Sequence, residues 1–380
     1  MRPTKILFVV DNYPPAFGGV ARSAHRLVTG FVTRGVNVVV LTIDPLIREN
    51  PQPDNDNSSK EPTNPVVVRV KRFPKDRDQL HELKYVGEKI VLEVRPDLII
   101  GFFIYRAGFI ATYLGQRYQT PVLLSIRGND LEISPFNPER HSMVIYALRY
   151  SNAITSVSQE LLDTAHALEP LTNQTCKVVF NGIDLSIAHQ RKDRFLGEEG
   201  RLVVGFLGDE RRKKGLMVLV KALKTLTRLE EKKKWLLRVA GPVGGKKKQV
   251  IREMVGEPKS LKVSFEGEIP PTEVEAFYTT LDLLVIPSLW DGMPNVLLEG
   301  VARKVPTIVS DIACMREYFP ATCVTFFESD NPTSLARALQ WVRSNPEAAS
   351  QKAKSARKHL EKNYRQEHEF DRWMKVIDDL

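Results

Sequence analysis

The feature of this sequence that most constrains its fold is a regular alternation of short apolar runs with helical patterns. After the first apolar run, apolar residues recur at helical spacing from Val20 to Phe31, and Gly35 ends the pattern. Strands that are apolar throughout and separated by helices imply a parallel sheet covered on both faces. The strand-length runs of the first half lie at 5–10, 37–43, 65–70, 96–102, 121–126 and 152–158.

The same rhythm restarts after a polar stretch at 189–201 that has no apolar period. A chain of 380 residues has room for two domains, each with its own core. The strand-length runs of the second half lie at 201–208, 234–241, 261–267, 282–288, 306–312 and 323–329; helical patterns follow at 331–345 and around Trp373.

These patterns predict an α/β protein with two doubly wound, Rossmann-like domains facing each other across a cleft. We place the first domain at 1–188, a linker at 189–200 and the second domain at 201–363, and we expect the C-terminal helix at 364–380 to pack back on the first domain. Ligands of such sheets bind outside the carboxyl ends of the strands, so the cleft is the expected site. The polar segment at 44–65 is expected to be a long exposed loop.

Charge and cysteine content narrow the function classes. The formal net charge is +9, from 55 Lys and Arg against 46 Asp and Glu. Such a charge suits nucleic acid, an anionic membrane surface or a phosphorylated substrate, but no nucleic-acid-binding motif is present, so we expect no nucleic-acid partner. Three cysteines fit a reducing, cytoplasmic compartment. The apolar stretch 98–115 contains Arg106, which favours a strand, loop and helix over a membrane span.

The stretch Pro287–Gly300, PSLWDGMPNVLLEG, carries the first candidate site. Pro294 suits the first position of a helix, whose free N–H groups and positive dipole end would bind an anion such as a diphosphate. Glu299 could accept hydrogen bonds from vicinal sugar hydroxyls, and Asp291 could reach a second sugar. The alternative is that Asp291 caps the helix and that Glu299 is only a surface charge.

A second candidate anion site follows the first strand of the second half. Arg211, Arg212, Lys213 and Lys214 stand just before Gly215, where a helix is expected to begin. Four cations at a helix N-terminus are unfavourable unless an anion binds there, although such charged runs are usually solvated. They could neutralise a departing diphosphate.

The first strand of the chain is followed by a pair of glycines. Gly18 and Gly19 lie at the expected turn from this strand to its helix, where the backbone could approach a ligand closely. Two other patterns do not point to sites. The stretch 241–248 is one residue short of a P-loop, and the Asp-Asn-Asp stretch 54–56, which mimics a metal-binding D-x-D motif, lies in the polar loop; no metal site is predicted.

Taken together, these stretches resemble the family 4 glycosyltransferases, the group 1 enzymes that are retaining and have the GT-B fold. The resemblance covers nearly the whole chain, because the motifs occur in the family's order on the expected elements. They are Gly18-Gly19, SVS at 156–158, NGID at 181–184, GDERRKKG at 208–215, PSLWDGMPNVLLEG at 287–300 and SDIACMREYF at 310–319.

The resemblance implies roles for individual residues. The family's E-x7-E signature falls on Asp291 and Glu299, so Glu299 would hold the nucleotide ribose and Asp291 the donor sugar. Arg211 and Lys214 resemble the family's diphosphate-binding Arg and Lys. The remaining implied donor-binding residues are Gly18, Gly19, Gly208, Met293, Pro294 and Asn295.

The sequence departs from the family pattern at three places. The first acid of the signature is Asp291 rather than glutamate, and the family's GR dipeptide is Gly208-Asp209, with Arg211 as the substitute. Arg127 stands where many members have a histidine. It cannot accept a proton, but it could contact a phosphate or an acceptor carboxylate. The alternative for Arg127 is an ion pair with Asp130 or Glu132.

The resemblance implies a retaining, metal-independent hexosyltransferase. Its donor would be a nucleotide-diphosphate sugar, which is a substrate, so no separate cofactor is expected. The acceptor would be a glycan, a lipid-linked molecule or a small molecule. An epimerase or phosphorylase of the same fold, or a non-catalytic protein that binds nucleotide sugars, are the alternatives. The positive charge and the apolar 98–115 region permit peripheral contact with the inner face of the membrane.

Overall fold

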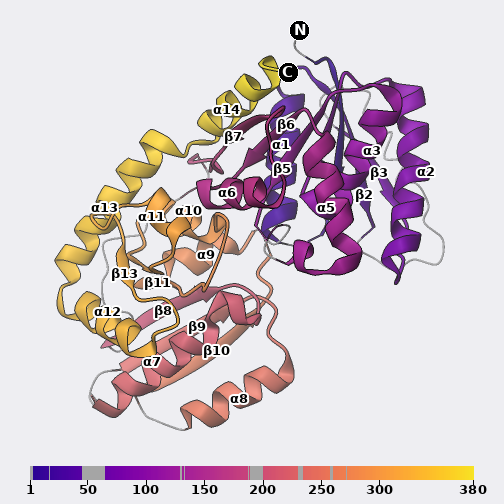
Figure 1. Cartoon of the computed structure of the whole chain (residues 1–380). Helices are drawn as coiled ribbons and strands as arrows, with labels where there is room; N and C mark the ends of the chain where they lie inside the picture. The colour runs from indigo at the N-terminus through magenta and orange to yellow at the C-terminus, as the bar shows by residue number, and fades with distance from the viewer. Residues whose placement is uncertain are drawn as a thin grey trace. The chain divides into compact units, whose positions relative to one another are not determined.

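The computed structural model of the chain divides into two compact units (Figure 1). The first unit comprises Met1–Asn181 and Glu367–Leu380, and the second comprises Gly182–Gln366. The structure describes residues 3–16, 18–44, 65–128, 131, 133–186, 188, 200–229, 234–256, 260–270 and 272–380. Residues 189–199 of the predicted linker at 189–200, and residues 45–64 of the predicted polar loop at 44–65, lie outside these residues.

The first unit contains a seven-stranded sheet in the order β3-β2-β1-β4-β5-β6-β7, and the paired strands are parallel throughout. The order reverses between β1 and β4, which is the topological switch point of a doubly wound sheet. The strands are β1 (Lys5–Val10), β2 (Asn37–Ile43), β3 (Val66–Val70), β4 (Leu98–Phe102), β5 (Val122–Ile126), β6 (Ala153–Ser156) and β7 (Thr175–Val178).

Every residue of β1 from Ile6 to Val10 is buried, because the sheet is covered on both faces. Ile6, Phe8 and Val10 point to one face, where they pack with helices α1 and α14. The helical elements of the first unit are α1 (Gly19–Val32), α2 (Asp76–Val94), η1 (Ile104–Gly108, a π-helix), α3 (Phe109–Tyr118), η2 (Ser134–Phe136), α5 (Pro138–Tyr150), α6 (Gln159–Leu168) and most of α14 (Gln366–Asp378).

The C-terminal helix α14 belongs to the core of the first unit. The Trp373 and Phe370 rings are fully or almost fully buried, and each makes an edge contact with Phe31 of α1. Arg26 of α1 donates hydrogen bonds to the buried carboxylate of Glu369 at 2.8 and 3.2 Å. The ion pair compensates for burying this charge beside an apolar core.

The second unit contains a six-stranded sheet in the order β10-β9-β8-β11-β12-β13, again with parallel pairing. Its order reverses between β8 and β11. The strands are β8 (Arg201–Leu207), β9 (Lys234–Ala240), β10 (Leu261–Gly267), β11 (Leu283–Ile286), β12 (Thr307–Ser310) and β13 (Thr325–Phe327). The helices are η4 (Arg212–Lys214), α7 (Leu216–Leu229), α8 (Gly245–Val255), α9 (Val274–Thr279), α10 (Asn295–Ala302), α11 (Ala313–Tyr318), α12 (Pro332–Ser344) and α13 (Pro346–Asn363).

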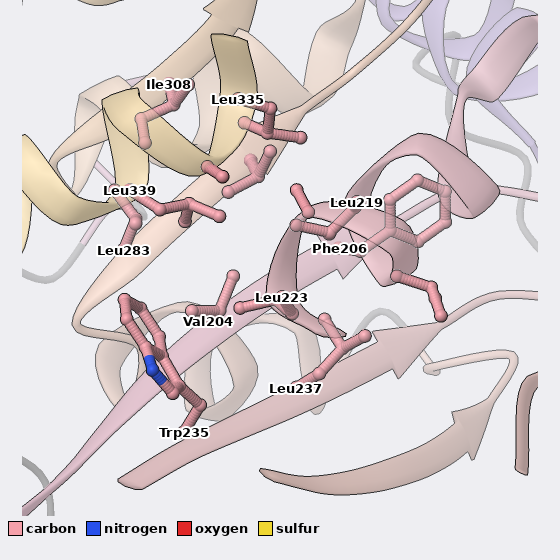
Figure 2. Packing of buried hydrophobic residues seen from close by; sticks show 14 of the residues in the cluster. Val204, Phe206, Leu219, Leu223, Trp235, Leu237, Leu283, Ile308, Leu335 and Leu339 are labelled. Carbon is pink, nitrogen blue, oxygen red and sulfur yellow. The ribbon is translucent and has the colours of Figure 1, made fainter. Parts of the chain in front are cut away.

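One face of this second sheet packs against α7 and α12 (Figure 2). Val204 and Phe206 of β8 lie with Leu219 and Leu223 of α7 in this cluster, and Trp235 closes it from β9. At about 25 cal/mol per Å² of apolar surface removed from water, such a cluster is the main force holding the sheet to its helices. Residues of β8 and β11 belong to this cluster, so the packing also positions the loops that follow these strands.

The predicted architecture is confirmed: both halves are parallel sheets with crossover helices. The stretch 98–115 forms β4, η1 and most of α3, as its charge predicted. In the described part of the chain, we find no helix with the length and apolar character that crossing a membrane requires. Two elements were missed: β7 begins at Thr175, before the expected NGID motif, and α13 is a separate helix after α12.

Candidate functional site

The candidate site of the second unit lies where the two strands at the switch point end. Strands β8 and β11 pair in parallel, with Leu283 opposite Val204, so their carboxyl ends leave the sheet together. The loop 208–215 follows β8, and the loop 287–294 follows β11. The Leu289 N–H donates to the Lys213 carbonyl oxygen at 2.7 Å, which ties one loop to the other.

Two glycines allow backbone segments to approach each other closely around the loop 208–215. Gly215 has a φ of +71°, and a Cβ at this position would overlap the Pro287 carbonyl oxygen. Gly241, with a φ of +119°, follows β9, and a Cβ there would overlap the Gly208 carbonyl oxygen. Gly208 itself donates its N–H to the Ala240 carbonyl oxygen at 2.9 Å, so this N–H serves the sheet. Larger residues at 215 and 241 would force the loops apart.

The contact between the loops brings Lys214 and Asp291 together. The Lys214 Nζ lies 2.6 Å from Asp291 Oδ2, and the two side chains are 21% and 12% exposed. Asp291 Oδ1 also accepts the Gly292 N–H at 3.0 Å. Burial opposes ionisation of Asp291, but the charges of Lys214 and Lys213 outweigh it and hold the pKa of Asp291 below its usual range.

The alternative role of Asp291 as a helix cap is wrong. Helix α10 begins at Asn295, and its N-cap is Pro294, which receives no side-chain cap hydrogen bond. Pro294 has extended backbone angles, φ −73° and ψ 116°, so it precedes the helix and does not occupy the first helical position that we predicted. Proline suits either position because its missing N–H would be unpaired in both.

Glu299 is not merely a surface charge. It is half-buried in α10, and its Oε2 accepts the Tyr278 hydroxyl at 2.7 Å. Tyr278 is fully buried, so it fixes this carboxylate from inside the unit. Arg303, one turn further along, donates to the Glu299 carbonyl oxygen at 2.9 Å and pairs with Glu275. The sequence analysis missed Tyr278 and Arg303 because no motif marks them.

The backbone before α10 is also held in place. Met293 is 7% exposed and Asn295 is half-buried. The Tyr318 hydroxyl, from α11, donates to the Gly292 carbonyl oxygen at 2.9 Å. The core of the second unit therefore positions the segment 292–295.

The cationic run is already neutralised within the chain. Arg211 makes three hydrogen bonds to the Asp209 carboxylate, at 3.0, 2.9 and 2.6 Å, and Arg212 pairs with Asp330 at 3.4 Å. Lys214 is likewise paired, with Asp291. These cations therefore do not need an external anion to make the helix start favourable, contrary to the expectation from the sequence. An anion would have to replace carboxylates that are already present.

In the first unit, the structure places the predicted residues at the ends of other strands. Gly18 is the N-cap of α1, with a φ of +123°, and Gly19 is the first helical residue. Arg127 follows β5; its guanidinium lies 4.5 Å from the Phe102 ring centroid and hydrogen-bonds to Asn181 of the NGID motif. The alternative partners Asp130 and Glu132 lie outside the described residues.

A cluster of charged residues at the β1–β4 switch point was missed. Asp11 follows β1 directly, and its Oδ2 lies 3.4 Å from Arg106 Nε in η1. A carboxylate immediately after a buried strand was the available signal, since residues at that place face the ligand side of such sheets.

Comparison with known proteins identifies the family. Residues 17–187 match the family described as Glycosyltransferase Family 4, and residues 189–359 match Glycosyl transferases group 1. A glycogen synthase of Mycobacterium tuberculosis is 25% identical over 390 aligned residues, covering 95% of this chain and 91% of that protein. TuaC of Bacillus subtilis, a glycosyltransferase named for teichuronic acid biosynthesis, is 24% identical over 253 residues, which cover 65% of this chain and 61% of TuaC.

Solved structures show the same fold. HepE of Anabaena, solved in complex with UDP-glucose, has a TM-score of 0.78 at 15% identity, over 99% of this chain and 100% of HepE. Sucrose-phosphate synthase of Thermosynechococcus elongatus has a TM-score of 0.81 at 15% identity, over 99% of this chain and 98% of that enzyme. The two family matches together span both sheets, and the chain therefore belongs to the group 1 glycosyltransferases of family 4, with the GT-B fold.

Proposed function

We propose that this protein is a retaining glycosyltransferase that moves a sugar from a nucleotide-diphosphate sugar to an acceptor hydroxyl. The observation that carries the proposal is the Lys214–Asp291 ion pair at the β8–β11 switch point. Asp291 precedes helix α10, whose Glu299 accepts a hydrogen bond from Tyr278. Paired charges at this place can exchange one anionic partner for another. No metal and no separate cofactor take part in the proposed reaction.

The donor is held by the second unit. Glu299 accepts hydrogen bonds from the ribose hydroxyls, and the backbone around 293–295 lies beside the diphosphate, with Gly208 on the opposite loop. Lys214 and Arg211 leave their carboxylate partners and bind the diphosphate oxygens, which is a charge-assisted interaction. Asp291, once released, accepts a hydrogen bond from the donor sugar.

The chemical step breaks the bond between the anomeric carbon and the diphosphate oxygen. The acceptor oxygen bonds to the same face of that carbon, and its proton passes to the leaving diphosphate. The positive charges of Lys214 and Arg211 stabilise the negative charge that develops on the leaving group, which is the largest catalytic contribution expected here. Arg127 cannot accept the proton and contacts an anionic group of the acceptor or donor.

The test uses the full chain with a panel of donors, beginning with UDP-glucose because HepE is solved with it. We expect transfer to a hydroxylated acceptor with retained configuration at the anomeric carbon, read by NMR of the product. Lys214→Ala and Glu299→Gln should both lose transfer. Conversion of the donor without any acceptor would indicate an epimerase, and unchanged transfer in both variants would contradict the proposed donor site.

A further inference from the structure

The β1–β4 switch point of the first unit carries a charged cluster that the donor site does not use. Strands β1 and β4 pair in parallel, with Val10 opposite Phe102, so both end at the same edge of the sheet. Asp11 follows β1, and Arg106 stands in the π-helix η1 just after β4. In doubly wound sheets this edge is the place where ligands bind.

Two atoms in this cluster are buried without a hydrogen bond. Within the described residues, neither Asp11 Oδ1 nor Arg106 Nε has a hydrogen-bond partner, although the two side chains form an ion pair at 3.4 Å. Both side chains are mostly buried, at 19% and 22% exposed. Buried polar atoms in native proteins are nearly always hydrogen-bonded, so an unsatisfied acceptor next to an unsatisfied donor indicates a missing partner.

The surrounding residues bring charges of both signs to the cluster. Asp76, in the first turn of α2, accepts the Tyr105 hydroxyl at 2.9 Å and Arg140 Nη2 at 3.2 Å, and lies 3.7 Å from Arg106 Nε. The carboxylates of Asp11 and Asp76 therefore face the guanidinium groups of Arg106 and Arg140, and the charge of Arg72 also acts on Asp11. Burial raises the pKa of Asp11, although the Arg106 charge opposes the shift, so the cluster is already poor in solvent.

The chemistry of these atoms selects a class of ligand. A carboxylate oxygen that needs a donor and an N–H that needs an acceptor together complement hydroxyl groups, which both donate and accept. A phosphate or carboxylate would satisfy Arg106 but would face the charges of Asp11 and Asp76. A neutral sugar with vicinal hydroxyls satisfies both atoms without adding charge.

We propose that the Asp11–Arg106 pair binds neighbouring hydroxyls of a neutral sugar, the residue of the acceptor that receives the transferred unit. The inference deepens the proposed function and rests on it, because it assigns the acceptor of that reaction to a glycan class. It makes Asp11 a substrate-binding residue, which requires that it touch the acceptor, whereas Asp76 and Arg140 position the pair.

The first experiment measures sugar binding directly, with no donor present. Saturation-transfer NMR of the full chain with the methyl glycosides of glucose, galactose, mannose and N-acetylglucosamine should show ring signals for at least one of them. These signals should disappear in Asp11→Asn and remain in Asp163→Asn, which changes an exposed carboxylate of α6. Glu299→Gln should also retain them, because that variant affects only the proposed donor site.

Three outcomes would overturn the inference. They are absence of binding to any glycoside by the wild-type chain, equal signals in Asp11→Asn, and displacement of the glycoside by inorganic phosphate, which would indicate an anionic ligand. Thermal unfolding of each variant shows whether a lost signal reflects lost folding. If Asp11→Asn does not fold, Asp11→Glu provides the second test, since it keeps the charge and should retain glycoside binding with altered affinity.

Transfer kinetics then separate this inference from the proposed function. With UDP-glucose as donor and the bound glycoside as acceptor, Asp11→Asn should raise the acceptor KM about tenfold or more, as expected for one lost charged hydrogen bond. The donor KM and the slow hydrolysis of donor by water should not change. If the wild-type protein does not bind the donor, the proposed donor site is refuted. If the acceptor KM is unchanged in Asp11→Asn, only the role of Asp11 is refuted.

Discussion

Asp291 is one methylene shorter than the glutamate of the family signature, and the structure shows what the shorter carboxylate contacts. It lies 2.6 Å from Lys214 Nζ and accepts the Gly292 N–H, so it is both paired and fixed. The pair holds the Lys214 Nζ in place before any donor binds. We therefore propose that a donor diphosphate competes with Asp291 for the same ammonium group.

Replacing Lys214 with alanine should reduce transfer far more than it reduces folding. Loss of one charged group that stabilises a developing negative charge costs about 100-fold or more in rate. Initial rates with saturating donor would measure the loss, and Lys246→Ala, at an exposed lysine of α8, is the matched control. Equal rates in the two variants would show that Lys214 does not act on the leaving group.

The Asp291 ion pair also predicts a pH dependence of stability. Because the folded pKa lies below the ordinary value of 3.8, the pair stabilises the fold above that value, and this stabilisation is lost as pH falls through the folded pKa. Asp291→Asn should lower the free energy of unfolding by about 1–3 kcal/mol near neutral pH. Urea unfolding of both proteins should show this difference shrinking below about pH 4, and a difference that is independent of pH would contradict the ion pair as its cause.

At the scale of elements, the donor site depends on two loops that touch. Gly215 permits the contact, because its φ is +71° and any Cβ would overlap the Pro287 carbonyl oxygen. Gly215→Ala should therefore destabilise the second unit by about 1–3 kcal/mol through backbone strain and displacement of the loop. Chemical denaturation measures this. Gly245→Ala is the control, since no atom lies within 4 Å of its Cβ and its φ is not positive; a comparable loss in both variants would rule out the loop contact.

The C-terminal helix α14 contributes to the stability of the first unit through its aromatic residues. Trp373 is fully buried against Phe31, so Trp373→Ala should cost about 3–5 kcal/mol. Trp341→Ala, at a tryptophan that is 36% exposed on α12, should cost about 1 kcal/mol or less. Differential scanning calorimetry would compare the two, and a larger loss for Trp341 would mean that α14 does not complete this core.

The sequence predicted strands better than it predicted the contacts between loops. The strands are buried on both faces, so they appear in the sequence as continuous apolar runs that are easy to recognise. Strands β1 and β2 have the predicted bounds. The partners of the cations could not be predicted. Asp291 is 77 residues from Lys214 and Asp330 is 118 residues from Arg212, so only the parallel pairing of the sheet brings these pairs together. Tyr278 and Arg106 were missed for the same reason.

At the scale of the whole molecule, the two units share one arrangement. In each, the sheet order reverses between its first and fourth strands, and a carboxylate–cation pair stands just beyond that point: Asp11–Arg106 in one unit and Asp291–Lys214 in the other. In the proposed function, the second pair exchanges its carboxylate for a diphosphate. The first has an unsatisfied donor and acceptor that match hydroxyl groups. This division of chemistry is what a transferase with two substrates requires.

The most direct test of the donor site is the shift in unfolding temperature that nucleotides cause in wild-type protein and in Glu299→Ala, with Glu253→Ala as control. A ligand at about 100 times its Kd stabilises the fold by about 2.7 kcal/mol, which is a shift of several degrees. We expect one of UDP, GDP or ADP, or its sugar conjugate, to raise the unfolding temperature of the wild-type and control proteins and to have little effect on Glu299→Ala. No shift with any nucleotide, or the same shift in Glu299→Ala, would contradict the proposed donor site.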